Sequence, residues 1–210
     1  MTELFISAFI TLFVVIDPPG CAPIYAGLSS EAPVRQQRMM ALKATFIASL
    51  ILLGFALFGQ QLLAALHIEL DAFRIAGGIM LFFIAVDMVF EKRTQRREER
   101  AEKVRAHNAQ TPEIDDVSVF PMAMPMIAGP GSIATIMLLM GKAEGTDTLV
   151  VLGALAAVMV LLLLALLAAV PIIRLLGSSI ESAITRLLGV LLAALAAQYV
   201  IDGLRGSFGI

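Results

Sequence analysis

Residues 148–173 read TLVVLGALAAVMVLLLLALLAAVPII and contain no charged side chain over 26 positions. About 20 apolar residues in a helix are enough to cross the hydrocarbon core of a bilayer. A second stretch, residues 44–66, has 23 uncharged positions. Of the whole chain, 59% is hydrophobic and 15% charged, against about 45–50% and 25% in soluble domains. The sequence therefore predicts an integral membrane protein.

The uncharged runs and their flanks predict an all-α protein with six transmembrane helices. These spans lie near residues 4–28, 42–66, 71–90, 118–140, 148–173 and 184–204. Between the third and fourth spans, residues 91–116 carry seven Lys or Arg and seven acidic residues. We expect this charged linker to begin as a solvated extension of the third helix.

The loops on alternate sides of the membrane differ in basic charge. One side, which includes the linker, holds 12 Lys and Arg residues, and the other side holds three, Arg74, Lys142 and Arg205. Cytoplasmic loops are enriched in Lys and Arg. The charge distribution therefore predicts a cytoplasmic linker and both termini outside the cytoplasm.

Two short matches between the halves indicate an internal repeat. Residues 16–20 (IDPPG) resemble 127–131 (IAGPG) at an offset of 111, and residues 74–77 (RIAG) resemble 186–189 (RLLG) at an offset of 112. Each half holds three spans, and an odd number inverts the second copy in the membrane. We expect one membrane domain of two inverted repeats, 1–90 and 117–210, joined by linker 91–116, as in many secondary transporters.

The first span of each repeat is interrupted by Pro and Gly, so we expect both spans to break into half-helices. In hydrocarbon, the freed backbone groups must find partners in protein, water or substrate. Asp17 lies at the first interruption, and an intramembrane carboxylate is costly enough to suggest substrate or proton binding. The alternative is that Asp17 caps the following half-helix, with Pro18 at its first position. At the second interruption, the glycine-rich helix start offers N–H groups to an anion.

Arg74 and Arg186 occupy equivalent positions in the two repeats, just inside the third and sixth spans. They either extend to the interface or turn inward to a polar cavity. Asp87 and Asp202 either lie at the interface or pair with these arginines. The candidate substrate-binding residues are Asp17, Pro18, Pro19, Gly20, Gly129, Pro130, Gly131, Ser132, Arg74 and Arg186.

Several functional classes find no support in the sequence. The single cysteine and the two histidines lack metal-ligand spacing, and no hydrolase or protease motif is present, so we expect no cofactor, no metal and no enzymatic activity. A net charge of −2 gives no basic surface for nucleic acid.

The six spans, the DPPG motif of residues 17–20 and the PMIAGPG motif of residues 125–131 resemble the MarC family of membrane proteins. The resemblance covers the whole chain, although the family usually has a less bulky residue at the position of Pro19. It implies a multi-pass protein of the bacterial inner membrane that transports neutral amino acids.

Three hypotheses follow. The first is a secondary transporter of small neutral amino acids, with a proton or sodium as the candidate coupling ion. The second is a carrier or flippase of lipid phosphates, such as polyprenyl phosphate, in which Arg74 and Arg186 hold the head group. The third is a non-transporting assembly factor or enzyme. Membrane lipids are expected contacts, and the sequence leaves a homo-oligomer open.

Overall fold

The computed structural model describes residues 1–30, 32–90 and 116–209, without the side chains of 170–182. Every regular element in these ranges is helical. The elements are α1 (Thr2–Ile16), α2 (Pro18–Leu28), α3 (Val34–Ala65), α4 (Leu70–Val89), η1 (Ser118–Ile127), α6 (Pro130–Lys142), α7 (Thr146–Leu167) and α8 (Ala169–Phe208). The predicted linker lies almost entirely outside the described residues.

Five described segments are long and apolar enough to cross a membrane, and η1 with α6 forms a sixth if the bent pair is counted as one span. The prediction of a helical membrane protein is thus confirmed. The helix ends differ from the predicted spans: α3 begins eight residues before residue 42 and α8 fifteen before residue 184. The charge pattern marks the part of a helix that lies in hydrocarbon, whereas hydrogen bonding continues the helix beyond it.

Two of the segments are interrupted. Between α1 and α2, Asp17 adopts a left-handed conformation with φ of 58°, and Pro18 starts the next helix. Between η1 and α6 the chain bends by 53°. Within η1, Phe120 and Met124 have extended rather than helical dihedral angles. Both interruptions lie next to prolines, which cannot donate the hydrogen bonds of a continuous helix.

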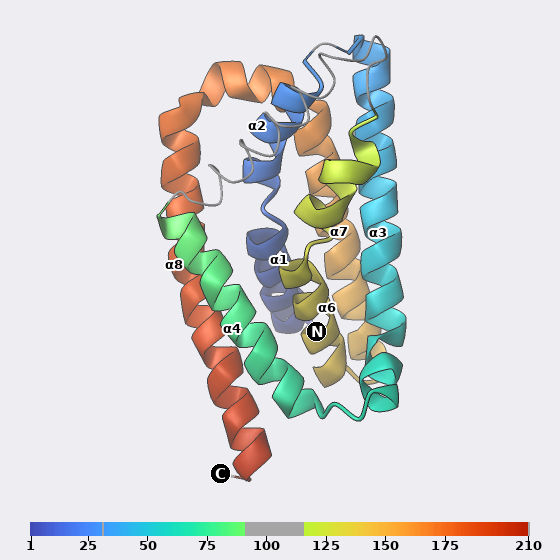
Figure 1. Cartoon of the computed structure of the whole chain (residues 1–210), viewed down its shortest axis with the longest axis vertical. Helices are drawn as coiled ribbons and strands as arrows, with labels where there is room; N and C mark the ends of the chain where they lie inside the picture. Colours follow the sequence, from blue (N-terminus) through green and yellow to red (C-terminus); the bar gives the residue numbers. More distant parts are fainter. Residues whose placement is uncertain (31, 91–115, 210) are drawn as a thin grey trace.

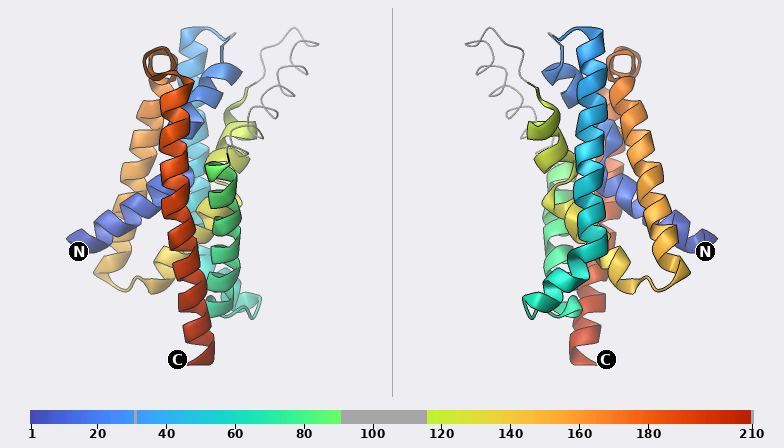
Figure 2. Two further views of the ribbon diagram at one scale, coloured as in Figure 1. Left: turned by 90° about the vertical axis from the view of Figure 1, so that its left-hand side faces the viewer. Right: turned by 90° about the vertical axis from the view of Figure 1, so that its right-hand side faces the viewer.

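The interrupted segments lie between two groups of long helices (Figures 1 and 2). On one side, α4 and α8 run antiparallel and make the most extensive helix contact of the described chain. On the other side, α3 packs against α7, η1 and α6, and α7 packs against α1 and α2. Two apolar clusters fill the spaces between these helices, and the interrupted segments contribute to both.

Small residues allow the close approach of α4 and α8. A Cβ atom added to Gly78 would lie 2.8 Å from the carbonyl oxygen of Ala196, and one added to Gly189 would lie 3.1 Å from that of Ala85. Near the other end, a Cβ at Gly203 would lie 2.8 Å from the carbonyl oxygen of Asp71. Glycine is common where membrane helices pack backbone to backbone. These contacts also set the register: the end of α8 lies beside the start of α4.

We predict that Gly78→Ala destabilises the protein by about 1–3 kcal/mol, because the new methyl group would press on backbone atoms of α8 that cannot rotate away. Thermal unfolding of the purified protein in detergent measures the effect. The control is Gly54→Ala in α3, where an added Cβ meets no atom within 4 Å. Equal melting temperatures for the two variants would show that α4 and α8 do not pack this closely.

Candidate functional site

Asp17 caps α2. Its side chain is buried, with 1% of the residue exposed, and Oδ1 accepts a hydrogen bond of 3.1 Å from the Gly20 amide. Pro18 fills the first helical position, where a missing N–H costs nothing. The capping role considered for Asp17 is therefore confirmed. It does not exclude a binding role, because a carboxylate can accept several hydrogen bonds at once.

Gly20 is required by this cap. A Cβ atom at Gly20 would lie 2.3 Å from Oδ2 of Asp17, so only glycine lets the carboxylate fold over the first turn of α2. Across the break, the Cys21 thiol of α2 donates a hydrogen bond of 3.5 Å to the carbonyl oxygen of Ile16, the last residue of α1. The Cys21 amide bonds to the carbonyl oxygen of Asp17. The residues of the first interruption thus supply hydrogen-bond partners for several of their own backbone groups.

The second interruption has no equivalent cap. Gly129 precedes α6 in an extended conformation and provides no side-chain hydrogen bond, and Pro130 takes the first helical position. The first intrahelical bond runs from the Ile133 amide to the Gly129 carbonyl oxygen, so the amides of Gly131 and Ser132 precede it. A Cβ at Gly129 would lie 2.4 Å from the carbonyl oxygen of Pro125, which makes glycine necessary here.

The start of α6 meets the end of α1. A Cβ atom at Gly131 would lie 3.5 Å from Cγ1 of Val15 and 2.5 Å from Cδ1 of Ile84 in α4. Three polar side chains near these helix ends in the sequence are buried: Asp17, which follows α1, and Ser132 and Thr135 in α6. The Thr135 hydroxyl has no hydrogen-bond partner. The structure therefore packs the end of α1, two residues before Asp17, against the start of α6.

The structure does not bring the two candidate arginines together. Arg74 lies in the first turns of α4, and Arg186 lies on α8 three residues before Gly189, which packs on Met88 at the end of α4. At 1.5 Å per helical residue, they are about 25 Å apart along the helix pair. Arg74 is largely buried, with 17% of its side chain exposed, whereas Arg186 is exposed.

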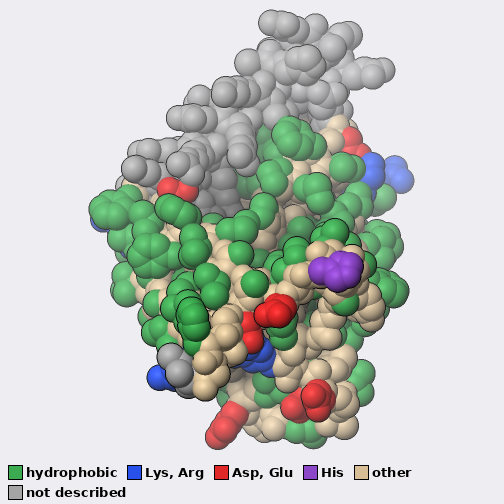
Figure 3. All heavy atoms as spheres, turned by 60° about the horizontal axis from the view of Figure 1, so that its bottom comes forward, with side chains coloured by type: hydrophobic (Ala, Val, Ile, Leu, Met, Phe, Trp, Pro, Cys, Tyr) green, Lys and Arg blue, Asp and Glu red, His purple; other side chains and the backbone are tan. Residues whose placement is uncertain are grey.

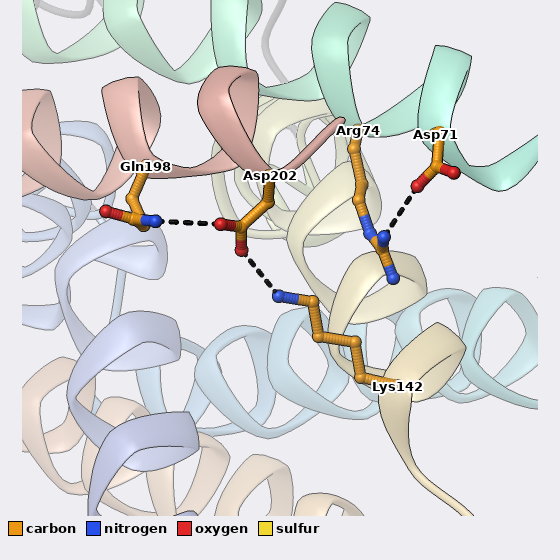
Figure 4. A network of polar contacts seen from close by, with 5 residues as sticks. All are labelled: Asp71, Arg74, Lys142, Gln198 and Asp202. Atoms are coloured by element: carbon orange, nitrogen blue, oxygen red, sulfur yellow. Dashed lines mark hydrogen bonds and ion pairs between the residues drawn. The ribbon is translucent and has the colours of Figure 1, made fainter. Parts of the chain in front are cut away.

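A polar cluster that the sequence did not predict lies near Arg74 (Figure 4). Lys142 Nζ at the end of α6 lies 2.8 Å from Asp202 Oδ2, and Gln198 donates a hydrogen bond of 2.7 Å to Asp202 Oδ1. Arg74 donates to Asp71 over 2.6 Å. We call these five residues the Lys142 network; they are Asp71, Arg74, Lys142, Gln198 and Asp202. In the sequence, charged residues at the ends of the apolar runs are the indication of this network. Which of these charges pair depends on the helix register, which the sequence alone does not give.

A second ion pair lies far along the bundle, where Lys43 of α3 contacts Asp116 just before η1. Burial would raise the pKa of Asp116, but the hydrogen bonds from Lys43 and Ser118 outweigh this effect and lower it. Both side chains are about half exposed. Within the described part of the chain, no three His, Cys, Asp or Glu side chains gather as metal ligands would.

Comparison with known proteins gives a consistent set of relatives. The family model described as "MarC family integral membrane protein" matches residues 2–208. A UPF0056 membrane protein of Methanocaldococcus jannaschii is 35% identical over 98% of both chains. A UPF0056 membrane protein of Aquifex aeolicus is 34% identical over 96% of this chain and 92% of its own. No solved structure matches the chain significantly.

We predict that Asp17→Ala lowers stability by at least about 1 kcal/mol, the usual cost of losing a helix cap. Asp17→Asn should be nearly as stable as the parent, because its amide oxygen still accepts from Gly20. Thermal unfolding in detergent measures both variants. If Asp17→Ala melts with the parent protein, the cap contributes nothing to the fold.

Proposed function

The chain belongs to the MarC family of integral membrane proteins, and on that basis we propose that it is a secondary transporter of small neutral amino acids. The observation that carries the proposal is the meeting of the two interrupted segments, with a buried carboxylate on one side and an uncapped helix start on the other. Transporters commonly bind substrates between discontinuous membrane helices.

The two sides of this region suit the two charges of an amino acid zwitterion. The first amides of α6, at Gly131 and Ser132, and the positive end of the helix dipole can receive the substrate carboxylate. Asp17 can receive its ammonium group, and the Thr135 hydroxyl can supply or accept a further hydrogen bond. The buried, closely packed surroundings favour a small side chain such as that of alanine, glycine or serine.

The pattern of helix contacts supports two inverted repeats, residues 1–90 and 117–210. α3 packs on η1 and α6 in the way that α7 packs on α1 and α2. Likewise α4 packs on α6, and α8 packs on α2. Exchanging the two halves therefore leaves the main contacts unchanged. In such transporters, movement of one repeat against the other exposes the central site to each side of the membrane in turn.

The lipid-phosphate hypothesis is less well supported. It requires Arg74 and Arg186 to hold one head group, since guanidinium groups bind phosphate oxygens bidentately. A separation of about 25 Å along α4 and α8 is too great for a single phosphate. Nothing in the described residues favours an assembly factor or an enzyme.

We predict that the protein reconstituted in liposomes exchanges radiolabelled alanine for unlabelled alanine. Asp17→Asn should reduce this exchange by about tenfold or more, the effect of removing one charge-assisted contact, while the protein stays folded. Asp116→Asn, at a distant ion pair, is the matched control and should exchange normally. Absence of exchange by the parent protein would refute amino acid transport, and exchange of a short-chain isoprenoid phosphate instead would revive the second hypothesis.

The proposal includes a location in the inner membrane with both termini outside the cytoplasm. It rests on the Lys and Arg count of 12 against three on the two sides. We predict that a reporter active only in the cytoplasm is silent when fused after Ile210 and active when inserted in the linker. A strong signal from the C-terminal fusion would show that the C-terminus lies in the cytoplasm, opposite to this prediction.

A further inference from the structure

The Lys142 network joins three helices at one end of the bundle. Asp71 and Arg74 come from α4, Lys142 from α6, and Gln198 and Asp202 from α8 (Figure 4). Two cations and two carboxylates therefore share one small region, and Figure 3 shows charged side chains gathered on this face of the molecule. The central region proposed above uses none of these residues.

The ammonium group of Lys142 occupies a place suited to any primary ammonium ion. It lies 2.8 Å from Asp202 Oδ2 and 5.8 Å from the centre of the Tyr199 ring. A carboxylate and an aromatic face together attract such a cation. The Lys142 side chain is 45% exposed and that of Asp202 is 26% exposed. Since half-exposed ion pairs are weak, a competing ammonium group can replace that of Lys142.

Arg74 beside it has an unused donor. Its Nη1 donates to Asp71, but its Nε is buried and has no hydrogen-bond partner in the part of the chain that the structure describes. A buried cationic donor without an acceptor is costly. Asp71 itself is fixed against α8, because a Cβ atom at Gly206 would lie 2.3 Å from Asp71 Oδ2. Because this nitrogen is buried, an incoming carboxylate reaches it only once Lys142 has moved aside, and it then supplies the acceptor that the described residues leave out.

We propose that Arg74, Tyr199 and Asp202 form a second, peripheral binding site for zwitterionic amino acids. The substrate ammonium group replaces that of Lys142 against Asp202 and Tyr199, and the substrate carboxylate accepts from Arg74. Arg74 interacts electrostatically with both Asp202 and Tyr199, the two residues that hold the Lys142 ammonium group, and Figure 4 shows the Arg74 and Lys142 side chains extending from their helices in this region.

The proposal rests on the proposed transport function and adds an entry step to it. Lys142 is the last residue of α6, the helix whose start forms the central region. Displacing Lys142 from Asp202 breaks a direct link between α6 and α8. Substrate binding at the peripheral site would thereby release the end of α6, part of the second interrupted segment, from its ion pair with α8.

Two variants distinguish a binding site from a structural ion pair. Lys142→Met keeps a long side chain but removes the competing ammonium group, so alanine binding should tighten by about threefold to tenfold. Asp202→Asn removes the acceptor, so binding should weaken by about tenfold. Arg74→Lys keeps the charge but not the Nε donor, and should also weaken binding. Equilibrium binding of radiolabelled alanine to the purified protein measures all three, in the Asp17→Asn background that disables the central region.

If Lys142 and Asp202 only tie two helices together, the two variants break the same bond and shift alanine binding in the same direction or not at all; either result overturns the proposal. Opposite shifts support it. Lys43→Met and Asp116→Asn are matched controls at the other ion pair and should leave binding unchanged. Melting temperatures identify any variant that is unfolded. In that case the double variant Lys142→Asp with Asp202→Lys, which reverses the ion pair, is tested instead. We expect it to bind alanine more weakly than the parent protein.

Competition separates the two charges of the ligand. Unlabelled alanine should compete far better than propylamine or propionate, each of which carries one of its charges. Equal competition by propylamine would mean a simple cation site and would overturn the zwitterion assignment. Failure of the parent protein to exchange alanine would refute the proposed function, whereas normal exchange with same-direction shifts would refute this inference alone.

Discussion

The structure depends on one constraint: inside hydrocarbon, a backbone N–H or C=O group without a partner costs several kcal/mol. A continuous helix meets this constraint by itself, but the two interrupted segments cannot. At the first, Asp17 supplies the acceptor for the Gly20 amide, and the Cys21 thiol donates to Ile16. At the second, no side chain of the described residues caps α6. The surrounding helices must therefore shelter both places from lipid.

Close packing provides that shelter, and glycine makes it attainable. Along α4 and α8, glycines at both ends of the pair admit backbone contacts that a methyl group would prevent. The same packing sets which charges meet. Because Gly203 and Gly206 lie against Asp71, the end of α8 is brought to Arg74 and Asp71, and Asp202 lies within reach of Lys142. The polar network is thus a consequence of the close packing of α4 on α8.

The sequence predicted what depends on local composition. Uncharged length indicated the spans, and the order of Asp, Pro and Gly in residues 17–20 indicated the cap. It did not predict helix ends such as Ala169, which hydrogen bonding sets beyond the apolar run. Nor did it predict the partner of Lys142, because Asp202 is 60 residues away and their meeting depends on the register of three helices. The separation of Arg74 and Arg186 required the antiparallel direction of α4 and α8.

The difference between the two interruptions bears on the kind of substrate. Position 128 holds Ala where the first interruption has Asp17. The start of α6 therefore keeps its positive end available, while α2 has its own carboxylate. Two capped ends would offer nothing to an anion, and two uncapped ends would attract an anion and repel a cation. One of each gives the proposed site one end of either polarity, with the end of α1 and the start of α6 packed together through Val15 and Gly131. A zwitterion has the same two polarities in one small molecule, which is why the proposed substrate is a neutral amino acid rather than an anion.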